Sequence, residues 1–124
     1  MLNTIEVELD KIRHLRFDIA ALLRLQQRIA EKSTMVVLQR IEQIDVEAIL
    51  VAYWIGLGNE DGALTLEKVR KLIQTKIESG ENLMALGRLV ARAIAMGAGF
   101  VEPAPESETA GDDAGKAPTP ETGT

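Results

Sequence analysis

The segment from Val46 to Leu57, VEAILVAYWIGL, limits the possible folds of this chain more than any other stretch. It has no charged residue after Glu47, and a helix that is hydrophobic on nearly every side must be buried. Its unbroken apolar run is about half of the roughly 20 residues that a helix needs to cross a bilayer. We therefore expect no membrane insertion, and a small, mainly α domain of about five helices wrapped around this central segment.

Shorter stretches with a one-sided apolar face predict the other helices. Several of them follow a residue that can cap the start of a helix, and Gly80 stands where a C-terminal glycine is expected. The predicted helices are 19 to about 31 after Asp18, a short one between Ser33 or Thr34 and Gln43, the central one after Asp45, one from Leu66 to Gly80 after Thr65, and Glu81 to about Ala95.

Residues 4–17 alternate between apolar and polar side chains, which is the period of a half-buried strand. Asp10 and Lys11 can turn the chain between two such runs. We expect a short N-terminal β-hairpin that lies against the helices or pairs with another subunit, because an isolated hairpin is only marginally stable. Its apolar positions are Ile5, Val7 and Leu9 on the first strand and Ile12, Leu15 and Phe17 on the second.

Residues 102–124 differ in composition from the rest of the chain. They contain all four prolines and no aromatic or branched aliphatic residue, so we expect a disordered acidic tail. Residues 1–101, expected to form one domain, carry equal numbers of acidic and basic residues, and the tail carries the whole net charge of −5. A neutral domain with an acidic tail argues against nucleic acid as a partner.

Enzymatic chemistry has few residues to support it. The chain has no cysteine, and its N-terminus lacks the basic-then-apolar order of a signal peptide, so a cytoplasmic protein is expected. His14 is the only histidine, and it lies in the expected hairpin without a nucleophile motif nearby. We expect a protein that is not an enzyme and that uses no cofactor and no metal.

The turn Asn59-Glu60-Asp61-Gly62 is similar to part of a calcium loop. The pattern fails at the first and twelfth positions, where Leu57 and Lys68 replace the carboxylates that would bind the ion. We interpret the segment as an interhelical turn.

The two predicted helices on either side of Gly80 are also compatible with a DNA-binding function. Arg88 and Arg92 lie one turn apart on the later helix, as they would on the recognition helix of a helix-turn-helix regulator. DNA binding of this kind is the alternative to a protein-binding role.

Large apolar side chains of the central and last helices are of the types that anchor protein interfaces, although a place in the core is the alternative for each. We expect Trp54 to be mainly structural and to pin the central helix to Leu66, Val69 and Ile73. The partner-binding surface is expected mostly at the start of the last helix. The residues assigned to partner binding are Leu83, Met84, Leu86, Tyr53 and Leu57.

Three motifs follow one another in an order that resembles a known family. Leu15-Arg16-Phe17-Asp18 leads from a strand into a helix, Trp54-Ile55-Gly56-Leu57 ends the apolar helix, and Leu64-Thr65-Leu66-Glu67-Lys68-Val69 starts the next one after an acidic turn. This order, over roughly residues 13–77, is similar to that of the small tail assembly chaperones of long-tailed phages and gene transfer agents. Family members usually have an acidic residue and Gly after the first helix, where this chain has Glu31-Lys32-Ser33.

The resemblance implies a viral protein of the host cytoplasm that is not an enzyme. Such chaperones bind the long helical tape-measure protein and help tail-tube subunits assemble around it. A client helix with apolar stripes needs an apolar groove, which Leu, Ile and Met side chains at helical spacing can supply. An acidic tail keeps such a protein soluble while the groove is open. Assembly into a homo-oligomer is expected as an alternative or addition to client binding.

Overall fold

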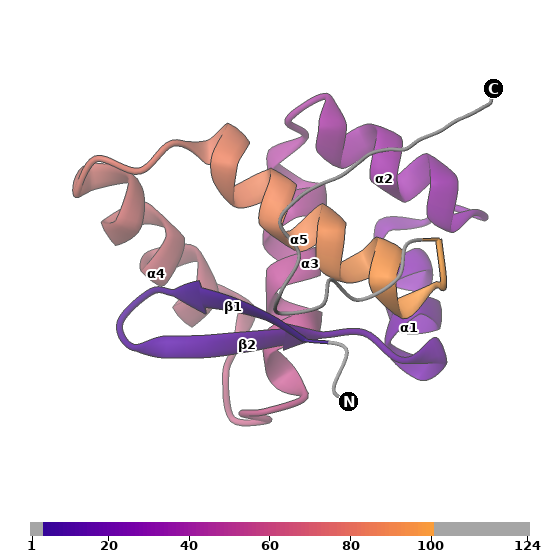
Figure 1. Cartoon of the computed structure of the whole chain (residues 1–124), viewed down its shortest axis with the longest axis horizontal. Helices are drawn as coiled ribbons and strands as arrows, with labels where there is room; N and C mark the ends of the chain where they lie inside the picture. The colour runs from indigo at the N-terminus through magenta and orange to yellow at the C-terminus, as the bar shows by residue number, and fades with distance from the viewer. Residues whose placement is uncertain (1–3, 101–124) are drawn as a thin grey trace, which may run out of the picture.

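The computed structural model describes residues 4–100. A two-stranded antiparallel hairpin precedes five helices, which confirms the expected mainly α fold with an N-terminal hairpin (Figure 1). The expected disordered tail, 102–124, lies outside the described residues, as do residues 1–3 and Val101. The elements are β1 (Thr4–Glu8), β2 (Ile12–Arg16), α1 (Ile19–Ile29), α2 (Thr34–Glu42), α3 (Val46–Gly58), α4 (Leu66–Glu78) and α5 (Leu83–Gly97).

Helix α3 forms the centre of the core, as its apolar sequence predicts. Eight of its 13 residues are buried, and they lie on all sides of the helix. It contacts each of the other four helices and strand β2. Asp45 starts it, because the Asp45 side chain accepts a hydrogen bond from the backbone N–H of Ala48. The other four helices and strand β2 therefore pack against one hydrophobic helix.

Helix α5 begins and ends two residues later than the sequence pattern predicts. It begins at Leu83 because the side chain of Asn82 accepts a hydrogen bond from the backbone N–H of Ala85 at 2.7 Å. It continues to Gly97, which packs directly against Phe17. Helix α1 ends at Ile29, before the expected Glu31, because Ala30 adopts a left-handed conformation with φ 64°.

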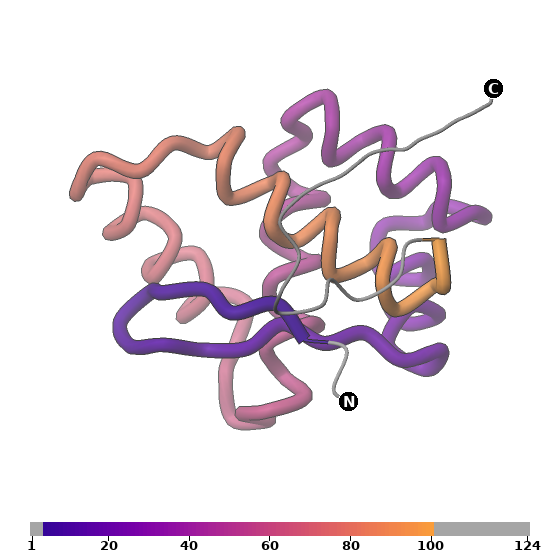
Figure 2. The backbone as a smooth tube through the Cα atoms, in the orientation of Figure 1, coloured from indigo at the N-terminus to yellow at the C-terminus, as the bar shows by residue number. Residues whose placement is uncertain are grey.

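The hairpin packs against α3 and α5 (Figure 2). Its register pairs Ile5 with Leu15, and its turn includes the expected Asp10 and Lys11. One expected inward residue is wrong: Ile12 is 55% exposed, whereas Arg13 is only 4% exposed. The reason is the two-residue period of a strand, which places Arg13 on the same face as Leu15.

Arg40 joins the three helices on the other side of the domain. Its guanidinium donates hydrogen bonds to Asp45 at 2.8 Å and to Glu31 at 3.1 Å. It also donates to the backbone carbonyl oxygen of Ile29 at the end of α1. One side chain of α2 therefore ties the end of α1 to the start of α3.

The contact between α5 and Phe17 predicts the effect of a single methyl group. A Cβ at position 97 would collide with the carbonyl oxygen of Phe17, whereas a Cβ at Gly58 would meet nothing within 4 Å. Gly97→Ala should lower the free energy of unfolding by about 1–3 kcal/mol because of this overpacking. The control Gly58→Ala, also in a helix, should be neutral or stabilise by up to about 1 kcal/mol. Urea denaturation measures both, and equal effects would contradict the close contact.

Candidate functional site

The residues that sequence reasoning assigned to partner binding separate into two groups. Met84 is 52% exposed at the start of α5, and Leu83 beside it is half-buried at the edge of the core. Tyr53, Leu57 and Leu86 are at most 1% exposed and belong to the core. Their assignment to partner contact is corrected, because α3 is covered on all sides and Leu86 lies on the inner face of α5. Only the first group is available to another protein.

Tyr53 connects the two helices that sequence reasoning had assigned to a partner. Its hydroxyl donates a hydrogen bond to the backbone carbonyl oxygen of Leu86 at 2.6 Å, inside the core. Burial raises the pKa of the Tyr53 phenol above its usual range, so the hydroxyl keeps its proton and remains a donor. The residue fixes α5 against α3.

Tyr53→Phe tests this structural role. The variant keeps the ring and removes one buried hydrogen bond, so the free energy of unfolding should fall by about 1 kcal/mol. Chemical denaturation followed by circular dichroism measures the change. A partner-contact role would be indicated instead by unchanged stability together with weaker binding of a client protein.

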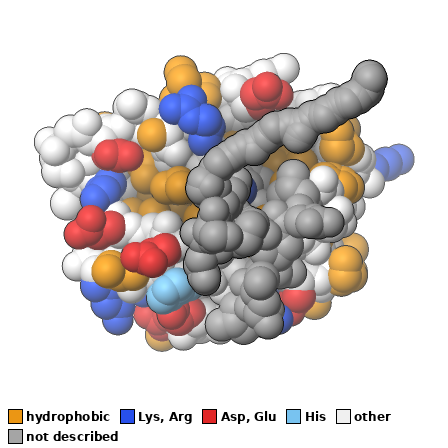
Figure 3. Space-filling model, in the orientation of Figure 1, with side chains coloured by type: hydrophobic (Ala, Val, Ile, Leu, Met, Phe, Trp, Pro, Cys, Tyr) orange, Lys and Arg blue, Asp and Glu red, His pale blue; other side chains and the backbone are white. Residues whose placement is uncertain are grey.

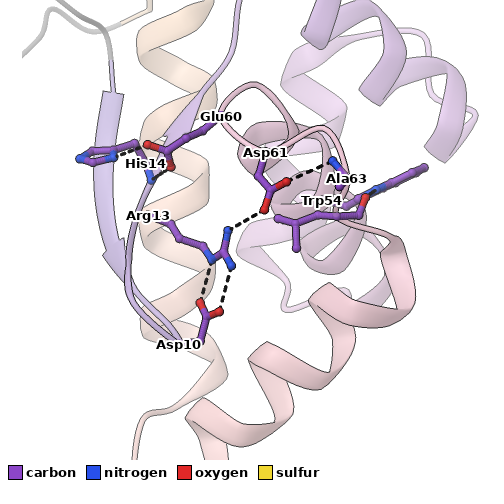
Figure 4. Close-up of polar contacts among 8 residues, drawn as sticks. Asp10, Arg13, His14, Trp54, Glu60, Asp61 and Ala63 are labelled. Carbon is purple, nitrogen blue, oxygen red and sulfur yellow. Dashed lines mark hydrogen bonds and ion pairs between the residues drawn. The ribbon is translucent and has the colours of Figure 1, made fainter.

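Arg13 is the centre of an ion-pair network between the hairpin and the turn after α3 (Figure 4). Its guanidinium donates two hydrogen bonds to Asp10, at 2.7 and 2.9 Å, and one to Asp61 at 3.4 Å. The two carboxylates compensate the burial of the cation. The hydrogen bonds from Arg13 lower the pKa of Asp10 from 3.8 to about 2. The network therefore holds the hairpin turn and the α3–α4 turn together.

His14 and Glu60 form a second link between the same two segments. One carboxylate oxygen of Glu60 accepts from the backbone N–H of His14 at 3.1 Å, and the other lies 3.0 Å from His14 Nδ1 (Figure 4). The His14 side-chain hydrogen bond, followed by the backbone one, lowers the pKa of Glu60. His14 is thus placed as a half-exposed residue that pairs with the turn.

The acidic turn itself has the arrangement of an interhelical connection. Asp61 contacts Arg13 and accepts from the backbone N–H of Ala63, and Glu60 is paired with His14. Within residues 4–100, no group of three or more potential metal ligands converges on one point.

No described helix combines the length and the apolar character that would let it span a bilayer.

The Arg13–Asp10 pair predicts a loss of stability in acid. Because the pKa of Asp10 lies at about 2 in the folded protein and at 3.8 ordinarily, the contribution of this group is complete above about pH 4 and disappears as the pH falls toward 2. Asp10→Asn should lower the melting temperature clearly at pH 6 and much less at pH 2.5. Thermal unfolding at both values checks this, with the exposed strand variant Glu6→Gln as control. An equal loss at both pH values would contradict the assignment.

A pocket of about 510 Å³, which sequence reasoning missed, lies beside Trp54. The half-buried indole donates from Nε1 to the carbonyl oxygen of Leu64 at 3.0 Å, and the guanidinium carbon of Arg28 lies 5.1 Å from the ring centroid. Trp54 thus anchors α3 to the turn just before α4, and it also contacts α1. The pocket is lined by Arg24, Gln27, Arg28, Trp54, Ile55, Gly58, Gly62 and Leu64. The spacing of Arg24 and Arg28, one turn apart on one helix face, was the available signal.

Helices α4 and α5 bear on the DNA-binding alternative. They are joined by four residues, 79–82, as a helix-turn-helix could be. However, each packs closely on α3, and they are not a closely packed pair with each other. Arg88 and Arg92 are exposed on α5.

Comparison with known proteins gave no match to a family model, to a curated protein or to a solved structure.

Proposed function

We propose that this protein is a tail assembly chaperone of the kind found in long-tailed phages and gene transfer agents, and that it binds the helical tape-measure protein in the host cytoplasm. The observation that carries the proposal is that the three motifs of the resemblance form one contiguous unit. A Cβ at Gly56 would lie 2.8 Å from the Phe17 ring and 2.9 Å from Leu15, so the first motif fills the space left by the glycine of the second. Trp54 of the second motif donates to Leu64, the first residue of the third.

Each motif contains a residue that is needed for the packing of this junction. The glycine admits the Phe17 ring, the indole fixes the turn, and Thr65 caps α4 through a hydrogen bond from the backbone N–H of Lys68. Short motifs of common residues are weak signals when they are scattered. Their meeting at one junction supports a common origin with proteins that share the same succession.

The client surface in this proposal is the outer face of α5. Met84, Arg88 and Arg92 are exposed at intervals of four residues on one face of the helix. Figure 3 shows hydrophobic side chains among charged ones on the face where α5 lies in front. An amphipathic client helix could place its apolar stripe on Met84 and its acidic residues near Arg88 and Arg92. Tail-tube subunits would then assemble on the bound tape-measure protein.

Met84→Glu tests the client surface. The introduced charge would be buried against an apolar stripe, so capture of the tape-measure protein should weaken by about tenfold or more. Met35→Glu is the matched control, because Met35 is 53% exposed on α2 and Met84 is 52% exposed on α5. The measurement is the soluble yield of the tape-measure protein and of its complex upon co-expression with each full-length variant.

Three outcomes are informative. Loss of the complex only with Met84→Glu supports the proposal and the surface. Equal binding by both variants places the client on another face, which contradicts the α5 surface. No complex and no gain in solubility with the unmodified protein would refute the chaperone function itself.

A further inference from the structure

The pocket beside Trp54 contains two cations without an internal counterion. Within residues 4–100, no carboxylate lies within 4.0 Å of the guanidinium of Arg24 or Arg28, whereas Arg13, Arg40 and Arg70 each have at least one such partner. The Arg28 guanidinium lies over the indole, and Arg24 lines the same pocket one turn earlier. Such a site suits a ligand that presents a carboxylate next to an apolar group that can pack on an aromatic wall.

The pocket also has room for a bulky ring. Gly58 and Gly62 form part of its wall, and a Cβ added at Gly58 would meet no atom within 4 Å. Ile55 and Leu64 contribute apolar surface between the indole and these glycines. The wall is therefore apolar on the α3 side and cationic on the α1 side.

The last 24 residues of the chain contain segments that combine a carboxylate with apolar proline rings, as the pocket requires. The pattern Pro-x-Pro-Glu occurs twice there, as Pro103-Ala104-Pro105-Glu106 and as Pro118-Thr119-Pro120-Glu121. Proline-containing segments bind grooves lined by aromatic rings at a small entropic cost, and a glutamate carboxylate is a natural partner of arginine. Residues 102–124 also carry the whole net charge of −5.

The C-terminal segment leaves the fold near the helix that carries the two arginines. Gly97 contacts Phe17, which stands just before α1, and α1 packs against α5. At about 1.5 Å per residue, Arg24 lies roughly 10 Å farther along the chain from Phe17. Glu106 follows Phe100 by six residues, and six extended residues span about 20 Å, so the first motif can reach the arginines and the second has still more chain available.

We propose that the pocket formed by Arg24, Arg28 and Trp54 binds the Pro-x-Pro-Glu motifs of the protein's own C-terminal segment. The prolines pack against the indole and Leu64, and the glutamate pairs with the arginines. Bound in this way, the segment covers the indole of Trp54 and supplies carboxylates to Arg24 and Arg28, which have no ion-pair partner within residues 4–100. This binding within one chain uses none of the residues of the client surface on α5.

Trp54 reports on the pocket directly, because it is the only tryptophan of the chain. The experiment measures acrylamide quenching of its fluorescence in the full-length protein. The indole should be protected in the unmodified protein at low salt. Protection should be lost in 1 M NaCl, and in a variant with Glu106→Arg and Glu121→Arg, because both changes weaken the ion pairs.

A charge exchange separates binding from a general structural effect. Arg24→Glu alone should expose the indole, and the combination of Arg24→Glu with Glu106→Arg and Glu121→Arg should restore protection. Arg28 is left unchanged, since it covers the ring itself. The matched control is Asp112→Arg with Asp113→Arg, which changes the charge by the same amount outside the motifs and should keep the indole protected.

Each result decides the proposal. It is overturned if quenching is the same in the unmodified protein and the Glu106/Glu121 variant, or if the Asp112/Asp113 control exposes Trp54 equally. Protection that disappears upon dilution would assign the bound segment to a second copy of the chain and overturn binding in cis. Protection that is independent of protein concentration, together with the charge-exchange rescue, supports it.

Discussion

The burial of α3 on all of its sides is the constraint on which the rest of the structure depends. A helix without a polar face cannot lie at the surface, so the other four helices and strand β2 supply its cover. The cost of this arrangement is close packing, visible where Phe17 fills the space left by Gly56 and meets the backbone of Gly97. One residue between β2 and α1 therefore contacts both α3 and α5 at positions where a glycine permits close approach.

Polar contacts then fix the orientation of elements that hydrophobic packing alone leaves free. Arg13 and His14 hold the hairpin to the turn after α3. Arg40 of α2 holds the end of α1 to the start of α3. Exposed ion pairs contribute little to stability, but a buried guanidinium such as that of Arg13 cannot be left without its carboxylates. An isolated hairpin is only marginally stable, and this one is stabilised both by hydrophobic packing and by ion pairs.

The two proposed binding surfaces lie on different elements and use different chemistry. The outer face of α5 offers Met84 and flanking arginines to an amphipathic helix, while the pocket between α1 and α3 offers two cations and an indole to an acidic proline motif. The two surfaces share no residue, so each can be substituted without changing a residue of the other. Client capture and self-binding can therefore be examined separately in the same full-length protein.

The sequence by itself determined the order of the elements, most of their caps and the buried position of α3, because periodicity and capping are local properties of the chain. It did not determine which face of a mixed strand points inward, so Ile12 and Arg13 exchanged their expected places. It also could not separate core from surface among large apolar residues, and Tyr53, Leu57 and Leu86 proved to be buried. Only the tertiary structure brought Arg24 and Arg28 beside Trp54, since contact between residues distant in sequence depends on how whole helices pack.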